Sequence, residues 1–309
     1  MDAAFSRRRL VAPERLRALS VRSVQRGALQ LGSHAGAILV TGLLIAQTWG
    51  TAWVAPALFA HGALLNFLYA GRRELSHGTM FATRRLNLLL GRITGFPPLS
   101  PRDFDTIQHW ARHQRIRTWE KDDEPVREPC TLRPHLLWLL GPSSWWSRVR
   151  RILRFSAGVV TEPDVRTDQQ ATVIREARIH LALYAVIAAV SIASESWAAV
   201  IRWLGPMVAT KLVNPLQNTI EHLGLSRGDD VLEHTRSTRT NALMRWLCWR
   251  MPHHTAHHAL PSAPFRQPNR LDAEIRGAWP SRCGRWAGSN SSASLSENSR
   301  MVAANPTTR

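Results

Sequence analysis

The chain has 309 residues, a mean hydropathy of −0.20 and a formal net charge of +18 at pH 7. This charge does not indicate nucleic acid binding, because the excess consists of arginines spread over every polar segment, a distribution that suits anionic lipid head groups. The three cysteines, Cys130, Cys248 and Cys283, are too far apart for a metal or redox motif and predict no disulfide.

The N-terminal segment is strongly basic. Residues 1–30 contain seven arginines, and residues 13–19 have the pattern of a short amphipathic helix at a membrane surface. Neither an apolar core nor a small-residue cleavage site follows at the distance typical of a signal peptide. We therefore expect a basic amphipathic entry segment that is retained.

A long uncharged stretch follows. No Asp, Glu, Lys or Arg occurs between Arg26 and Arg72. A helix that crosses a bilayer needs about 20 mostly apolar residues, so this stretch predicts two membrane spans, at about residues 31–48 and 51–71. Polar residues and a tryptophan around Gly50 predict the turn between them.

A second apolar region, residues 179–213, contains three charged residues, Glu195, Arg202 and Lys211. The sequence Ser-Glu-Ser-Trp around Glu195 predicts a turn between spans at residues 179–194 and 197–213. A charge inside a span costs about 3 kcal/mol on insertion scales unless it reaches the interface. A pair of buried soluble helices is the alternative for this region.

The arginine distribution predicts the orientation. Both presumed turns contain no Lys or Arg, whereas the other segments are rich in Arg, so both termini and the long loops should face the cytoplasm. We expect an all-α integral membrane protein with four transmembrane helices in two hairpins and a cytoplasmic, histidine-rich helical cap. This membrane domain should cover residues 31–270, and the polar residues 271–309 should form a disordered tail.

Most of the histidines gather at three places on the predicted cytoplasmic side. The densest group is His253, His254, His257 and His258. On a helix, His254 shares a face with the residues three and four positions later, so three imidazoles can face a metal ion. Imidazole suits iron, zinc, copper or nickel. A group this dense favours a metal site.

The other histidines are weaker signals one by one. His109 and His113 are helical i, i+4 partners, and His77 follows the second predicted span. His222 lies at the end of the fourth predicted span, on the same helix face as Asn218. A solvated surface helix explains each of these equally well when it is taken alone.

Taken in order, these motifs resemble the membrane fatty acid desaturase and hydroxylase superfamily. Its first box reads His-Glu-x-x-His before Thr-x-Phe, and residues 73–81 read Arg-Glu-Leu-Ser-His-Gly-Thr-Met-Phe. Its second box reads His-x-x-His-His, and residues 109–113 read His-Trp-Ala-Arg-His. Its third reads Trp-Asn-Met-Pro-Tyr-His-x-Glu-His-His, and residues 249–258 read Trp-Arg-Met-Pro-His-His-Thr-Ala-His-His. The resemblance covers about residues 10–270.

The resemblance implies a non-haem di-iron centre that uses dioxygen to remove hydrogen from the C–H bonds of acyl groups. It implies membrane acyl lipids as substrate, a ferredoxin or reductase as electron donor, and, through its bacterial branch, an inner-membrane location. It assigns the iron ligands to His77, His109, His113, His222, His254, His257 and His258. It places around them Glu74, Asp122, Glu221 and Asn218.

Besides three changes in the third box, at Arg250, His253 and Ala256, two positions lose a histidine of the family pattern. Arg73 stands where the first box has its first histidine, and Arg112 stands where the second box has its middle histidine. A guanidinium has no free lone pair and stays charged, so it cannot ligate iron and repels a dication. Three hypotheses therefore stay open: a desaturase or hydroxylase with an altered site, a catalytically impaired lipid-binding or interaction protein, and a zinc-dependent hydrolase that uses the third box.

Overall fold

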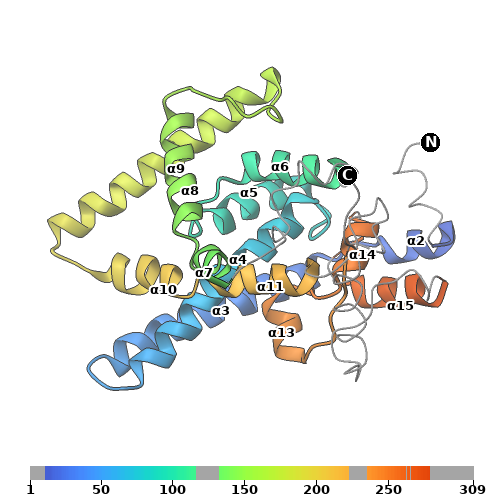
Figure 1. Cartoon of the computed structure of the whole chain (residues 1–309), viewed down its shortest axis with the longest axis horizontal. Helices are drawn as coiled ribbons and strands as arrows, with labels where there is room; N and C mark the ends of the chain where they lie inside the picture. Colours follow the sequence, from blue (N-terminus) through green and yellow to red (C-terminus); the bar gives the residue numbers. More distant parts are fainter. Residues whose placement is uncertain (1–10, 116–131, 223–234, 262, 265, 279–309) are drawn as a thin grey trace, which may run out of the picture.

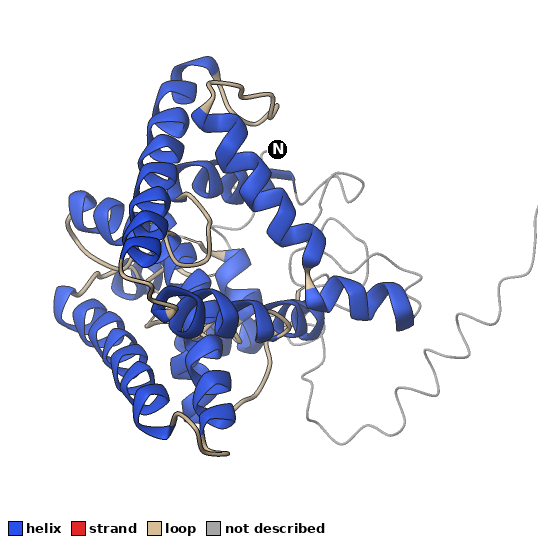
Figure 2. Cartoon of the chain, turned by 90° about the vertical axis from the view of Figure 1, so that its left-hand side faces the viewer, coloured by secondary structure: helices blue, strands red, loops and turns tan. Residues whose placement is uncertain are grey.

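The computed structural model describes residues 11–115, 132–222, 235–261, 263–264 and 266–278, without the side chains of 112–115, 222 and 278. Over these residues the protein is helical, with loops and one isolated β-bridge between Ser237 and His253 (Figures 1 and 2). The helices are α2 (Pro13–Leu19), α3 (Val24–Thr48), α4 (Val54–Ser76), α5 (Arg84–Gly95), α6 (Arg102–Arg115), α7 (Leu132–Leu140), α8 (Pro142–Ser156), α9 (Thr167–Ala193), η3 (Val200–Leu204), α10 (Gly205–Ala209), α11 (Val213–His222), α13 (Ala242–Leu247), α14 (His254–Ala259) and α15 (Pro268–Ala278).

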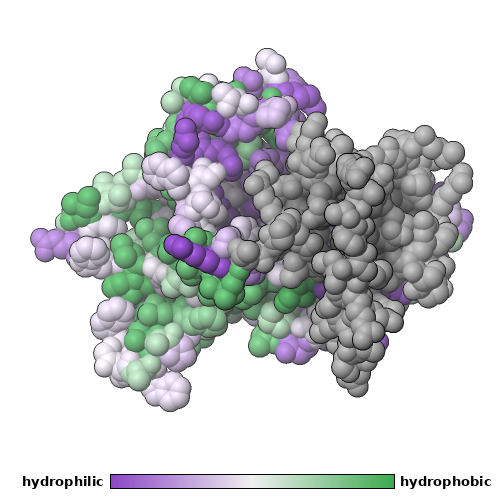
Figure 3. All heavy atoms as spheres, in the orientation of Figure 1, coloured by the Kyte–Doolittle hydropathy of each residue, from purple (hydrophilic) through white to green (hydrophobic). Residues whose placement is uncertain are grey.

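Three of the described helices, α3, α4 and α9, are long and apolar enough to cross a bilayer. Helix α3 contains the first predicted span, α4 covers the second from residue 54 onward, and α9 covers the third up to residue 193 but begins at residue 167, earlier than expected. Leu39 and Leu43 on α3 are 69% and 64% exposed, and hydrophobic side chains gather around α3 and α4 in Figure 3. Apolar faces of this size, turned outward on long helices, suit contact with lipid rather than water.

The fourth predicted span is not confirmed as a continuous helix. The polypeptide after Trp197 forms the π-helix η3, the short helix α10, a turn at 210–212 and then α11. Pro206 has no N–H group to donate to the carbonyl of Arg202, four residues earlier, so the regular helix is interrupted there. The His61 Nε2 group donates to that carbonyl instead, at 2.7 Å. A histidine of α4 therefore provides the hydrogen bond that this carbonyl lacks within its own helix.

Helix α4 lies at the centre and contacts α3, α5, α6, η3, α10 and α11. Its closest approach is to α10, at Gly62, where an added Cβ would lie 2.2 Å from the carbonyl oxygen of Pro206. The buried Asn66 side chain, one turn later, donates to the carbonyl of Met207 at 2.8 Å and to Thr210 Oγ1 at 3.0 Å. This contact fixes α10 against α4.

The C-terminal helices close the other end of the molecule (Figure 1). Buried apolar residues of α2, α14 and α15 form one cluster, which includes Leu19, Ala256, Leu271 and Ile275. The predicted domain boundary at residue 271 therefore falls inside a packed helix, because Leu271 and Ile275 face this cluster. The rest of the predicted tail, residues 279–309, lies outside the described residues.

We predict that reporter fusions inserted at Gly50 and at Glu195 report the side of the membrane opposite to the histidine boxes. Both residues lie in turns, after α3 and after α9, at the end of the molecule away from α14 and α15 (Figure 1). The arginine-rich segments lie elsewhere and should be retained in the cytoplasm. Cytoplasmic signals at both insertion points would contradict this topology.

We predict that Gly62→Val destabilises the protein by about 1–3 kcal/mol, since any side chain at this position pushes α10 away from α4. Thermal unfolding in detergent, followed by tryptophan fluorescence, measures the effect. Gly36→Val is the matched control, because Gly36 is also in an apolar helix but has no atom within 4 Å of an added Cβ. Equal losses of stability in the two variants would argue against the proposed close packing.

Candidate metal centre

Three histidines from distant parts of the sequence meet at the end of α4. His77 follows the last residue of α4, His109 lies on α6 and His257 lies on α14. Their ligand nitrogens lie within 4.8 Å of one another. The Nε2 atoms of His77 and His109 are 2.8 Å apart, and the ring centroids of His77 and His257 are 4.9 Å apart. Three convergent imidazoles are a typical donor set for a first-row transition metal.

Local backbone features hold His77 in place. Gly78 adopts a left-handed conformation with φ of +66°, which turns the backbone away from the end of α4. The Asn87 side chain accepts from the backbone N–H of Phe81 at 3.1 Å and donates to its carbonyl at 2.8 Å. The loop after His77 is therefore tied to α5.

A carboxylate of α9 positions α6, the helix that carries His109. Glu176 is buried and accepts hydrogen bonds from the backbone N–H groups of Arg102 and Asp103, at 2.9 and 2.6 Å. These are first-turn N–H groups, which have no partner within their own helix. The contact fixes the start of α6 about two turns before His109.

The third box forms the short buried helix α14. His254, His257 and His258 lie on it as the spacing predicts, with 4.3 Å between the ring centroids of His254 and His258 and 5.6 Å between those of His257 and His258. His253 precedes the helix and faces Asp272, with 3.8 Å between Nδ1 and Oδ2. It is therefore directed to α15 rather than to the three-histidine cluster.

Two buried carboxylates lie behind these histidines. Glu74 Oε1 is 3.4 Å from Nδ1 of His257, and Glu221 Oε2 is 3.4 Å from Nδ1 of His254. A carboxylate next to Nδ1 favours the tautomer with a proton on that atom and leaves Nε2 as the metal-binding atom. Glu74 and Glu221 thus lie beside the Nδ1 atoms of two predicted ligands.

The remaining predicted residues are placed only in part. The side chains of Arg112, His113 and His222, and the whole of Asp122, lie outside the described residues. Their predicted roles stay predictions. Asn218 borders a polar cavity that His109 also lines.

Arg73 lies beside this centre and is only 8% exposed. Burial lowers the pKa of His77 to about 3, the charges of His257 and Arg73 add to this effect, and Glu74 opposes it. His77 is therefore neutral near pH 7, with a lone pair available to a metal. Among the described residues, these three histidines form a group whose ligand atoms converge on one point, which suits one metal ion.

A comparison with protein families gives the fatty acid desaturase model as a match over residues 47–289. The chain belongs to the fatty acid desaturase family. The matched region includes all three boxes, so the resemblance based on the motifs is confirmed. A comparison with curated proteins finds no match.

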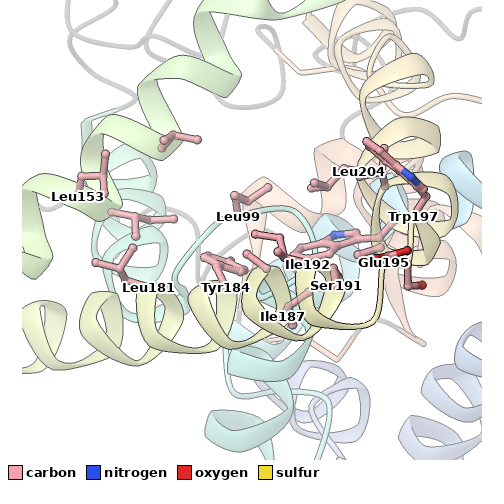
Figure 4. Close-up of a pocket in the computed structure, with 17 residues that line it drawn as sticks. Leu99, Leu153, Leu181, Tyr184, Ile187, Ser191, Ile192, Glu195, Trp197 and Leu204 are labelled. Atoms are coloured by element: carbon pink, nitrogen blue, oxygen red, sulfur yellow. The ribbon is translucent and has the colours of Figure 1, made fainter.

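This member of the desaturase family also has an apolar cavity of about 710 Å³ (Figure 4). It lies between α8, α9 and η3, and its walls include Leu153, Leu181, Tyr184 and Trp203. None of the described residues that line it is a histidine. Sequence reasoning did not find this cavity, because its walls come from segments that only the fold brings together.

We predict that Glu74→Gln lowers metal affinity about 10- to 100-fold, because the amide no longer stabilises the His257 tautomer that binds through Nε2. Competition with a chromophoric chelator, using protein purified in detergent, measures the affinity. Glu195→Gln removes the same charge from the turn after α9 and should leave the affinity unchanged. Equal affinities for the Glu74→Gln variant and the unmodified protein would show that Glu74 does not orient a ligand.

Proposed function

We propose that this protein is a membrane-bound, desaturase- or hydroxylase-type oxidoreductase that acts on the acyl groups of membrane lipids. One observation carries the proposal: each of the three boxes contributes one histidine, His77, His109 or His257, to a single point. This convergence also favours a centre shared by three segments over a zinc site made by the third box alone.

A redox metal held here would supply, with dioxygen as the oxidant, the oxidising power for cleaving an unactivated C–H bond, which amino-acid side chains do not provide. The three histidines would hold the metal. Glu74 and Glu221 would keep the imidazoles oriented, and the burial of α14 would keep water from the centre. Iron is the metal that family membership supports, and a ferredoxin or a reductase would deliver electrons from the cytoplasm.

Two features support an acyl lipid as the substrate. The apolar cavity at α8, α9 and η3 is within the size range of ligand sites and has almost entirely apolar walls. Leu99 borders this cavity, and the next residue, Ser100, borders the polar cavity that His109 also lines. One short segment therefore separates the apolar space from the surroundings of the metal centre.

The proposed location is the bacterial inner membrane, with the boxes on the cytoplasmic side.

The second candidate function is that of a catalytically impaired, desaturase-fold lipid-binding or interaction protein. The buried position of Arg73 favours it, because a permanent cation lies where the family has a metal ligand. At 4 Å, two unit charges interact by about 4 kcal/mol at an effective dielectric constant of 20. A metal ion close to Arg73 would therefore bind more weakly than in a site with histidine there.

We predict that the purified protein binds fewer than two iron ions and that the double variant Arg73→His/Arg112→His binds more. Each change replaces a permanent cation with a neutral donor. The two positions belong to one site and should couple, so each single variant should recover little. Metal analysis of the four proteins, with cellular fatty acid profiles as the activity measurement, tests this.

The control is Arg150→His, on the exposed face of α8. It should leave the iron content unchanged. Two irons in the unmodified protein would show that the two arginines do not limit metal binding. New double bonds or hydroxyl groups in the fatty acids would separate an active enzyme from an impaired relative.

A further inference from the structure

A second cavity, of about 430 Å³, lies against the histidine cluster and is lined by α4, α6, α8, α11 and the segments beside them. Among the described residues of its walls, one is acidic: Asp105, which forms an ion pair with Arg72. The other charged groups in the walls are all basic: Arg73, Arg148, Arg151 and Lys211. The described walls therefore carry a clear excess of positive charge.

Lys211 is the most unusual of these residues. It lies in the turn between α10 and α11, it is only 6% exposed, and its ammonium group makes no hydrogen bond or ion pair with any described residue. Arg148, a second cation, lines the same cavity. A buried ammonium without a counterion is unfavourable, so its position suits an anion that the cavity admits.

The N-terminus of α8 adds further donors. Gly141, which precedes this 15-residue helix, provides no side-chain cap, and Ser143 and Ser144 of the first turn line the cavity. An added Cβ on Gly141 would lie 3.1 Å from Cε of Lys211, so the lysine packs against the start of α8. Backbone N–H groups and the positive end of the helix dipole both favour an anion here.

We propose that this cavity binds a phosphate group, carried either by free phosphate and its monoesters or by the head group of an anionic phospholipid. A phosphate dianion offers two charges and several acceptor oxygens to the arginines, the lysine and the hydroxyls, whereas a carboxylate offers one charge and two oxygens. Arg73 occupies the position at which the family has a histidine. Arg73, which replaces a metal donor of the family, thus forms part of the wall of this cavity. Phosphate binding here is a function separate from the proposed oxidation and does not require it.

Calorimetric titration of the full-length protein with inorganic phosphate, in an uncharged detergent and phosphate-free buffer, tests the proposal. Lys211→Met should weaken binding at least about tenfold, since it removes one charge-assisted contact. Arg150→Gln removes a charge from the exposed face of α8 and should bind phosphate like the unmodified protein. Thermal unfolding without phosphate shows whether the variants fold. Because Lys211→Met removes a buried, unpaired charge, its unfolding temperature should be no lower than that of the unmodified protein.

A second arm measures lipid binding by native mass spectrometry, with phosphatidic acid against phosphatidylcholine. Lys211-dependent binding of inorganic phosphate supports a site for free phosphate or a monoester. Lys211-dependent retention of phosphatidic acid, without binding of inorganic phosphate, supports a head-group site. The absence of Lys211-dependent binding in both arms, or an equal loss in Arg150→Gln, would overturn the proposal. Iron content measured on the same samples keeps this result separate from that of the metal centre.

Discussion

The packing of one indole ring joins the parts of the protein that form the metal centre. Trp249, fully buried, lies so close to α4 that an added Cβ on Gly71 would be 2.7 Å from its ring, and its Nε1 group donates to Nδ1 of His34 on α3 at 3.1 Å. Trp249 and Arg250 both have positive φ, so the backbone turns sharply there and then enters α14. If this contact is lost, the third box is no longer fixed against the first.

Around that junction the protein buries an unusual number of charged and titratable groups. Glu74 and Glu221 are each 2% exposed, and both lie beside imidazoles. Buried charges are unfavourable unless each has a partner, so their accumulation indicates function rather than stability. The carboxylates complete the surroundings of a metal site, whereas the cations beside it, Arg73 and Lys211, belong to a cavity suited to phosphate.

Family membership and present chemistry are thus separate questions for this protein. The fold and the converging histidines are those of a fatty acid desaturase family member. Arg73 changes the balance, because it exchanges a neutral donor for a fixed positive charge at the edge of the centre. The same exchange favours anions in the adjacent cavity. Arg73 therefore acts on both metal binding and anion binding.

The sequence alone determined the apolar helices α3 and α4, the short helix α2 and the grouping of histidines on α14, because these depend on local composition and helical spacing. It could not show that His77 and His109 meet His257 in particular, since long-range packing decides which imidazoles converge. Nor could it show the break at Pro206, which is tolerated because His61 satisfies the carbonyl of Arg202 from another helix. The phosphate cavity, too, is a property of tertiary structure: cations that are far apart in the sequence come to line one cavity when α4, α8 and α11 pack.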